Sequence, residues 1–356
     1  MAMNTGTHDV ASTLAIATQS VASVGVDRVA EALAAQRAAH NRIVREDLMG
    51  SLVDITTDRL RVSGMAAQGT MMEVDEYGEG PTQRQGTPTT VGLPLKLYQW
   101  PIGWTAKWME IKTPADLALQ QAGAFEAHLS VLQREIKKAF YLSGNYTFVD
   151  RLIDRVSLPV KRLYNADSVV IPNGPNNQTF DGSTHTHYSA ESTSAMTAAG
   201  VTALIANVIE HGVRGPVIVA ISSGDETAMR ALTGFTAATD AELILSTTTV
   251  RTATPLDMFD PNDRFIGKFG AAQVWVKPWA IDSYVVAYDS DPANKPLSLR
   301  QREQATLQGL QLVATTTAHP LTSEFFEAEF GIGAWNRGKM AVLYTAGTSY
   351  TDPTIT

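Results

Sequence analysis

The sequence predicts an α+β protein in which a long hairpin and a long helix precede a mixed centre of strands and helices. Three observations support this class: strand-like runs over residues 70–108, a capped amphipathic helix over residues 113–143, and a strand–helix–strand order from residue 217 onward. The chain has 356 residues, of which 44% are apolar. This length and composition allow one large or two medium domains with a sizeable core.

The N-terminal region is predicted to be a mobile arm that leads into a helix. Residues 1–25 are mostly small and polar, which is typical of a terminus without fixed structure. Residues 26–49 carry apolar side chains at helical spacing, so we expect a helix there. Four arginines lie away from its apolar stripe, namely Arg28, Arg37, Arg42 and Arg45. A short strand is predicted near Leu60 and Val62.

The ribbon over residues 70–108 has an apolar pattern that changes phase along the chain. Apolar side chains first alternate on odd positions, at Val91, Leu93, Leu95 and Leu97, and then on even positions, at Trp100, Ile102, Trp104, Ala106 and Trp108. A change of phase turns the buried face over, so the ribbon offers its two faces to two surfaces. An isolated two-stranded ribbon is marginally stable in water. We therefore expect an arm that packs on another subunit.

Charged residues gather near the tip of this ribbon, where we expect contacts between subunits. They include Glu73, Asp75, Glu76 and Arg84. An acidic run of this kind can be a cation site or a solvated strand edge that resists aggregation. We favour a third interpretation, in which the acidic arm meets basic residues of another subunit, and the four arginines of the N-terminal helix are one possible partner set.

The clearest helix of the chain is predicted to begin after Thr113. Thr113 is a suitable N-cap, Pro114 suits the first helical position and Asp116 places an acid in the first turn. Apolar residues follow at steps of three and four up to Phe140, and Gly144 ends the pattern. At 1.5 Å per residue such a helix is on the order of 45 Å long.

The remaining elements follow from similar patterns. A helix is predicted around residues 201–209 and ends at Gly212, and a buried strand follows over residues 217–221. Ser223 and Glu226 have the spacing of a capping box for a short helix. Further strands are predicted over residues 264–269, 273–277, 284–288, 310–314 and 341–345.

Two stretches have the residue types of a chemical site, but neither predicts one. Ser222 lies between a strand and a helix, as in the nucleophile elbow of a serine hydrolase, and Asp257 or Asp282 and then His319 follow in the required order. That fold needs several parallel βαβ units, and the sequence predicts one, so we expect no enzyme and interpret the serine as a helix cap.

A second candidate site is the pair His185 and His187. On a strand both side chains would point the same way, which suits a metal ion. The chain has no cysteine, and no carboxylates cluster near this pair in the sequence. We therefore interpret the pair as polar residues beside a turn, and we expect no metal and no cofactor.

Composition excludes several other functions. The formal net charge is −8 and the isoelectric point is about 5.4, which argues against a nucleic-acid binder because phosphate contacts need clustered Lys and Arg. The absence of cysteine excludes disulfides. No apolar run approaches the ~18 residues of a membrane helix. The first ten residues lack the features of a secretory signal, so we expect a cytoplasmic product.

Three stretches and the order of the elements resemble a known protein family. The stretches are NYTFVDRLIDRVSLPVKRLYNAD, FDGSTHTHY and EFGIGAWNRGKMAVLYTAG. From about residue 25 to 347 the chain resembles the major capsid proteins of tailed bacteriophages, which share the Hong Kong 97 fold. The resemblance implies hexamers and pentamers that form an icosahedral shell around double-stranded DNA. An encapsulin-type compartment, which has the same fold and holds enzyme cargo, is the nearest alternative.

The resemblance also implies a division of the chain and a set of partners. Residues 1–50 would be the N-terminal arm and residues 66–103 the extended loop. Residues 51–65, 104–189 and 299–356 would form the peripheral domain, with residues 113–143 as its spine helix, and residues 190–298 the axial domain. The implied partners are a portal and either a separate scaffolding protein or none, and the resemblance leaves the presence of a decoration protein open. The implied location is the virion capsid after assembly in the host cytoplasm, without a membrane.

Overall fold

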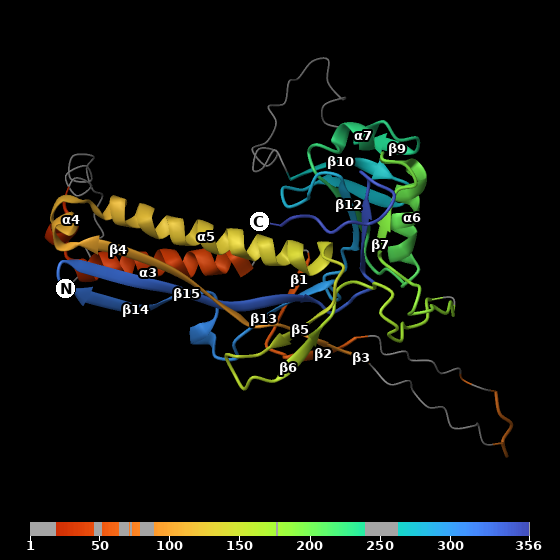
Figure 1. Ribbon diagram of the computed structural model, residues 1–356, viewed down its shortest axis with the longest axis horizontal. Helices are drawn as coiled ribbons and strands as arrows, with labels where there is room; N and C mark the ends of the chain where they lie inside the picture. Colours follow the sequence, from red (N-terminus) through yellow and green to blue (C-terminus); the bar gives the residue numbers. More distant parts are fainter. Residues whose placement is uncertain are drawn as a thin grey trace. The chain divides into compact units, whose positions relative to one another are not determined.

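The computed structural model describes residues 19–45, 52–63, 71, 73–78, 89–175, 177–238 and 263–355. The chain divides into two compact units (Figure 1). Unit 1 comprises Met1–Met49, Leu95–Gln133 and Gln301–Phe330. Unit 2 comprises Gly50–Pro94, Arg134–Arg300 and Gly331–Thr356. Helices and sheets both contribute, which confirms the predicted mixed α and β class. The predicted division into arm, loop, peripheral and axial parts stays a prediction.

Unit 1 contains a long antiparallel sheet. Its central strand is β15 (Leu321–Ala334), which pairs with β14 (Leu310–Ala318) on one side and with β4 (Lys96–Thr105) on the other. The register runs from Leu321 opposite Thr105 to Phe330 opposite Lys96. A short 3-10 helix, η3 (Ala305–Leu307), precedes β14.

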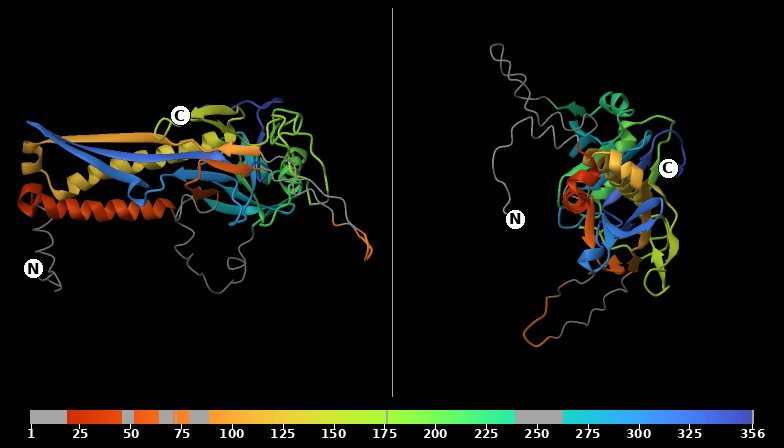
Figure 2. Two further views of the ribbon diagram at one scale, coloured as in Figure 1. Left: turned by 90° about the horizontal axis from the view of Figure 1, so that it is seen from below. Right: turned by 90° about the vertical axis from the view of Figure 1, so that its left-hand side faces the viewer.

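Helices run alongside these strands (Figure 2). They are α2 (Val21–Val24), α3 (Val26–Ile43), α4 (Ala106–Ile111) and the first part of α5 (Pro114–Tyr141). A small apolar core joins them to β4 and contains Val21, Val29, Trp104 and Leu117. The amide side chain of Gln121 on α5 also donates to the Leu33 carbonyl on α3, at 2.9 Å.

Helix α5 confirms the predicted capped helix. The Thr113 hydroxyl accepts from the Asp116 backbone N–H at 3.4 Å, and the Asp116 carboxylate accepts from the Thr113 backbone N–H at 3.0 Å. These reciprocal bonds satisfy backbone donors that the first helical turn leaves free. The hydrogen bonds to Thr113 lower the pKa of Asp116.

Unit 2 is built on a seven-stranded mixed sheet in the order β7-β16-β12-β8-β11-β10-β9. These strands are β7 (Tyr188–Ala190), β8 (Val217–Ile221), β9 (Phe235–Ala237), β10 (Arg264–Phe269), β11 (Ala272–Val276), β12 (Tyr284–Asp289) and β16 (Met340–Tyr344). Strand β8 pairs in parallel with β11 and antiparallel with β12. All six residues of β12 are buried, as expected for a central strand.

Helix α6 (Ala198–Ile209) covers one face of this sheet (Figure 1). Its buried side chains Val201, Leu204, Ile205 and Val208 join the sheet residues in the largest core of unit 2. Helix α7 (Glu226–Arg230) follows β8. The predicted capping box of Ser223 and Glu226 is wrong, because Asp225 is the N-cap residue and its backbone N–H bonds to the Ser222 hydroxyl at 3.2 Å.

Smaller strand pairs of unit 2 hold the base of the predicted extended loop. Strand β2 (Leu60–Ser63) pairs antiparallel with β3 (Thr89–Gly92), and β5 (Tyr146–Val149) pairs with β6 (Ser157–Val160). Strand β1 (Val53–Thr56) pairs in parallel with β13 (Leu297–Gln301), and both belong to the same five-stranded sheet as β15. The guanidinium of Arg300 donates to the Leu93 carbonyl at 2.8 Å and to the Asp150 carboxylate at 2.9 Å. Both charged side chains are almost fully buried.

Candidate assembly surface

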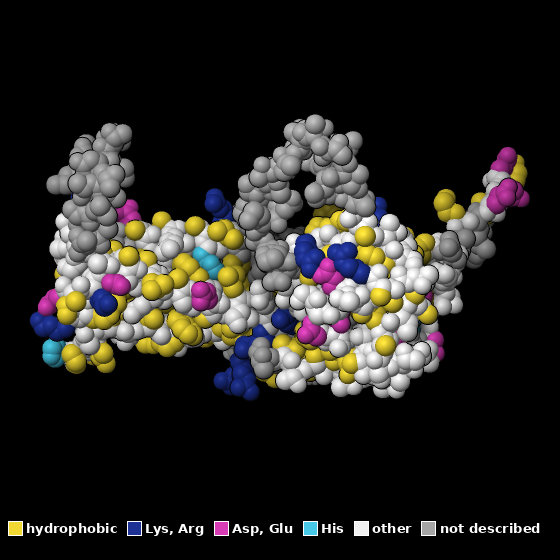
Figure 3. All heavy atoms as spheres, turned by 90° about the horizontal axis from the view of Figure 1, so that it is seen from above, with side chains coloured by type: hydrophobic (Ala, Val, Ile, Leu, Met, Phe, Trp, Pro, Cys, Tyr) yellow, Lys and Arg dark blue, Asp and Glu magenta, His cyan; other side chains and the backbone are white. Residues whose placement is uncertain are grey.

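Unit 1 carries large apolar side chains that its own chain leaves exposed. Leu119 on α5 is 73% exposed and Ile111 at the end of α4 is 75% exposed. Others on this unit are Val26, Ile43, Leu97, Trp100, Val313 and Leu321. Figure 3 shows apolar side chains in scattered patches among polar ones on the face viewed from above. Large apolar side chains left exposed in this number make unit 1 a candidate for contacts with other copies of the chain.

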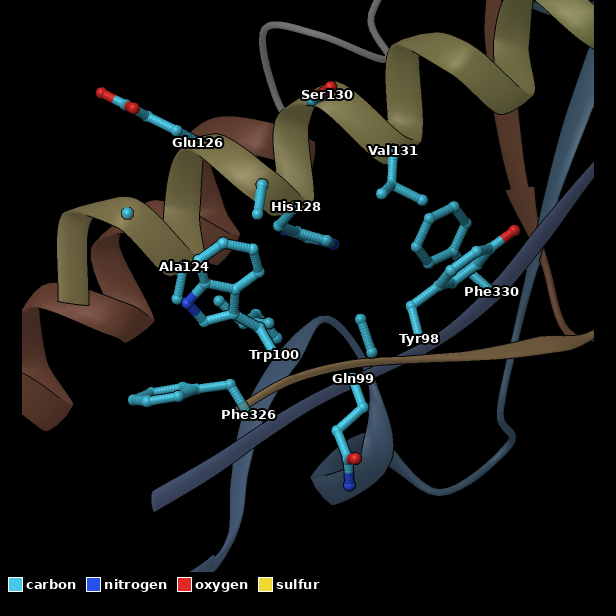
Figure 4. A pocket seen from close by; sticks show the side chains of 14 residues that line it. Tyr98, Gln99, Trp100, Ala124, Glu126, His128, Ser130, Val131, Phe326 and Phe330 are labelled. Carbon is cyan, nitrogen blue, oxygen red and sulfur yellow. The ribbon is translucent and has the colours of Figure 1, made fainter. Parts of the chain in front are cut away.

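A hollow of about 600 Å³ lies in unit 1 between α5 and the strands β4 and β15. Figure 4 shows the rings of Tyr98, Trp100 and Phe330 around it, whereas Glu126 points away. The rings of Tyr98 and Phe330 pack at a centroid distance of 4.8 Å. The lining is therefore largely apolar, and Trp100 at its rim stays 43% exposed.

His128 lines this hollow, and the half-buried His40 lies next to it in unit 1. His128 is 7% exposed, and its Nδ1 lies 3.0 Å from Nε2 of His40. The His40 ring stacks on Phe125 at a centroid distance of 4.4 Å. Burial lowers the pKa of His128 to about 4, and repulsion from His40 contributes in the same direction. Both imidazoles are therefore held in an environment that favours the neutral form at neutral pH.

The expected contacts of the ribbon with another subunit need correction at three apolar positions. Val91, Leu93 and Leu95 are 0%, 0% and 1% exposed within their own chain. The Leu93 side chain lies where a side chain at Gly333 would stand, and its backbone N–H bonds to the Arg59 carbonyl at 2.9 Å. These three side chains are therefore not free to pack on a neighbour. Leu97 is 45% exposed and stays accessible.

The predicted change of phase is seen only in its second half. Residues 91–95 are all buried, at even as well as odd positions, whereas in β4 the partly or fully buried residues include Tyr98, Ile102 and Trp104 at even positions. Val91 and Leu93, which precede β4, belong to unit 2. Strand β4 pairs with β15 and packs on the helices of unit 1.

The acidic residues near the ribbon tip are exposed. Glu73, Asp75 and Glu76 all lie in the described part of the ribbon, at a turn where the Asp75 carboxylate accepts from the Tyr77 backbone N–H at 3.1 Å. Met71 and Tyr77 in the same stretch are 100% and 89% exposed. Arg84 lies outside the described residues. The tip thus combines carboxylates with exposed apolar side chains.

The arginines of α3 and the residues that follow it differ in their surroundings. Arg28, Arg42 and Arg45 are exposed. Arg37 is partly buried near Glu324 of the same unit. Burial lowers the pKa of Arg37, and the charge of Glu324 partly offsets this effect. Arg37 therefore has an acidic neighbour in its own chain, and the three exposed arginines are better suited to a contact between subunits.

The interpretation of Ser222 as a helix cap is wrong, because Asp225 is the N-cap residue of α7. The Ser222 hydroxyl donates to the Asp225 carboxylate at 3.0 Å, and the serine is 4% exposed. Asp282 lies beside Gly224, His319 belongs to unit 1, and Asp257 lies outside the described residues. The serine thus bonds to the N-cap residue three positions later and does not itself cap the helix.

His185 and His187 have two neighbours that the sequence did not indicate. Their Nε2 atoms lie 3.1 Å apart, and each lies 3.0 Å from Nε2 of His211. A Glu210 oxygen lies 3.6 Å from the His185 Nε2. Burial lowers the pKa of all three imidazoles, that of His211 to about 3. Glu210 and His211 were missed because they follow α6, more than 20 residues later in the sequence.

Among the helices in the described ranges, none has the length and apolar character needed to cross a membrane. No family model matches the chain, and no curated protein matches its sequence.

Solved structures do resemble this chain. One described as "Mycobacterium phage Patience" has a TM-score of 0.67 and 19% identity, and the match covers 92% of this chain and 89% of that chain. "Capsid of empty GTA particle computed with C5 symmetry" has a TM-score of 0.47 and 12% identity, over 86% of this chain and 90% of that chain. The holo-SrpI encapsulin complex from Synechococcus elongatus PCC 7942 has a TM-score of 0.46 and 8% identity, over 88% and 90%. The first of these likenesses confirms the predicted resemblance to phage proteins at the level of the fold.

Proposed function

We propose that this chain is the major capsid protein of a tailed bacteriophage. It forms hexamers and pentamers that close into an icosahedral shell around double-stranded DNA, with a separate scaffolding protein and a portal as partners. The observation that carries this proposal is the fold shared with the Mycobacterium phage Patience structure over 92% of the chain.

In this proposal α5 is the spine helix, residues 66–103 are the extended loop, and residues 190–298 form the axial domain. The exposed apolar side chains of unit 1, with Leu119, Ile111 and Trp100 among them, are the surface on which neighbouring copies of the chain pack. Burial of such side chains stabilises association by about 25 cal/mol per Å² of apolar surface before entropic costs. Each contact is weak, and the number of copies makes the shell stable.

Charge complementarity suggests where the ribbon tip docks. Its carboxylates are exposed at the turn around Asp75, and the exposed arginines are on and just after α3. A tip that reaches the α3 region of the next copy would bring opposite charges together. Exposed ion pairs contribute about 0.2–1 kcal/mol each, so their main effect is on orientation and rate of association.

Electron microscopy of the purified full-length protein tests the proposal. We expect closed particles some hundreds of ångströms across, and light scattering should report masses of many copies. A protein that stays monomeric in both measurements over a wide range of concentration would contradict the proposal. Particles that enclose a specific enzyme instead of DNA would favour the encapsulin-type compartment.

A charge exchange tests the proposed docking of the ribbon. The substitutions Glu73→Lys, Asp75→Lys and Glu76→Lys together should slow or prevent particle formation, because the tip would then face the arginines with like charge. Adding Arg28→Glu, Arg42→Glu and Arg45→Glu should restore assembly. The same three lysine substitutions with Arg37→Gln are the matched control, because Arg37 already lies near Glu324. If the sixfold variant assembles no better than the control, the pairing is wrong.

A further inference from the structure

Three histidines and one glutamate of unit 2 converge on one point. His185 and His187 precede β7, with Thr186 between them, and Glu210 and His211 follow the C-terminal end of α6. One ligand atom from each of the four lies within 4.8 Å of all the others. Thr186 pairs with Asn165 in an isolated β-bridge. The side chains of His185 and His187, on either side of Thr186, therefore both point to the face opposite to that of Thr186, as on a strand.

The three imidazoles meet through the same ring atom. The Nε2 atoms form a nearly equilateral triangle with sides of 3.1, 3.0 and 3.0 Å. Nδ1 of His187 lies 2.7 Å from the Met340 carbonyl oxygen. A carbonyl oxygen can only accept, so this Nδ1 carries the proton, and in the neutral ring Nε2 of His187 has a free lone pair.

Hydrogen bonds among the three rings cannot satisfy all three Nε2 atoms. With no proton on Nε2 of His187, the remaining two rings must supply every donor. If both carry a proton on Nε2, two N–H groups face each other; if one does, a pair of bare nitrogens faces each other. In every arrangement of neutral rings at least one side of the triangle is therefore repulsive. A cation that accepts all three lone pairs removes the conflict.

The dimensions and the ligand types fit a divalent transition metal. Bonds of about 2.0–2.1 Å from Zn²⁺ to imidazole nitrogen place tetrahedral ligand nitrogens about 3.3–3.4 Å apart, close to the triangle seen here. Imidazole ligands suit Zn²⁺ and its neighbours and not Mg²⁺ or Ca²⁺. The Oε1 atom of Glu210 lies 3.6 and 3.8 Å from the Nε2 atoms of His185 and His211. It is buried without a hydrogen-bond partner, and it can complete a fourth position.

The surroundings hold the ligands in place. The Met340 carbonyl fixes the orientation of the His187 ring, which is the usual role of the outer hydrogen bond of a metal-ligating histidine. The ring of Phe180 packs on His185 and His211 at centroid distances of 4.9 and 4.5 Å. Gly338 leaves room for His211, because a Cβ there would lie 2.9 Å from the imidazole Cγ.

We propose that His185, His187, His211 and Glu210 form a binding site for one Zn²⁺ ion. Four protein ligands in a largely buried position are typical of a structural site and leave no open position for a substrate. The ion would tie the segment before β7 to the end of α6 and, through Met340, to β16. These segments are distant in the sequence, so the ion would act as a cross-link inside unit 2 of a chain that has no cysteine.

Metal analysis of the full-length protein without an affinity tag tests this site. After dialysis against Zn²⁺ and then against metal-free buffer, we expect elemental mass spectrometry to find about one Zn²⁺ per chain. The double variant His185→Gln/His211→Gln should retain less than a tenth of that. His319→Gln is the matched control, because it removes an exposed histidine of unit 1 and should retain the wild-type content.

Two further measurements do not depend on how the double variant folds. Replacement by Co²⁺ should give the visible absorption of a tetrahedral cobalt site in the wild-type protein. A strong chelator should lower the unfolding temperature of the wild type and of His319→Gln, and added Zn²⁺ should restore it. A wild-type protein that binds no stoichiometric Zn²⁺, shows no cobalt spectrum and unfolds at the same temperature with chelator would overturn the proposal. Equal loss of metal in His319→Gln would also overturn it, since the binding would then be adventitious.

Discussion

The exposed side chain of Leu119 gives a sharp test of the assembly surface. Complete burial of a leucine side chain contributes about 1.5–3 kcal/mol. Leu119 is 73% exposed in the single chain, so a neighbour that covers it would gain about 1–2 kcal/mol per subunit. Because a free-energy change of 1.4 kcal/mol is a factor of ten in an equilibrium constant, Leu119→Ser should raise the protein concentration needed for assembly by about 5- to 30-fold.

The measurement is the threshold concentration for particle formation, followed by light scattering and checked by electron microscopy. Leu119→Met is the matched control, since it keeps the apolar volume and the helical propensity and should assemble near the wild-type threshold. The thermal stability of unassembled Leu119→Ser should change little, because an exposed substitution usually alters the free energy of unfolding by about 0.5 kcal/mol or less. If the serine and methionine variants have the same threshold, Leu119 does not lie in a contact between copies.

Three further predictions concern the stability of the chain. Arg300→Met should lower the free energy of unfolding by about 3–5 kcal/mol, because it leaves the buried Asp150 carboxylate with the more distant Arg59, at 3.5 Å, and removes the guanidinium donor of the Leu93 carbonyl. In urea unfolding, Arg300→Met/Asp150→Leu should recover the part of this loss that comes from the unpaired carboxylate, and an additive loss would contradict the buried pair. The pKa of His128 is about 4 in the folded chain, against about 6.5 when unfolded, so the unfolded state binds the proton first, and stability should fall by on the order of 3 kcal/mol as pH drops from about 6.5 to about 4. Unfolding measured at several pH values across that range should show that the free energy of unfolding depends less on pH in His128→Gln than in the wild type. An unchanged pH dependence would refute the low pKa of His128. Gly331→Ala should lower the unfolding temperature, because the added Cβ would collide with the Pro94 carbonyl, at a cost of about 1–3 kcal/mol. An unchanged unfolding temperature would show that the backbone shifts to accommodate the Cβ.

The sequence determined those elements whose signals lie within a few residues of each other. Thr113, Pro114 and Asp116 specified the start of α5, because a cap is made by hydrogen bonds within one turn. Five strands of the seven-stranded sheet, β8, β10, β11, β12 and β16, followed from short apolar runs, with bounds that agree within a residue or two, whereas β7 and β9 were not predicted. The alternation of Tyr98, Ile102 and Trp104 in β4 was also readable, since alternation of side chains is a local property of a strand.

The tertiary structure decided which surfaces those elements meet. Alternation showed that Val91, Leu93 and Leu95 share a face, but not that this face would pack within its own chain, which depends on strands and glycines more than 200 residues away. The partnership of Arg300 with Asp150 likewise joins residues that are 150 positions apart. The sequence showed His185 and His187 as a pair; the packing of α6 on its sheet brought His211 and Glu210 to them. Local sequence patterns cannot specify such contacts, because these contacts form only when segments distant in the sequence pack together around a common buried core.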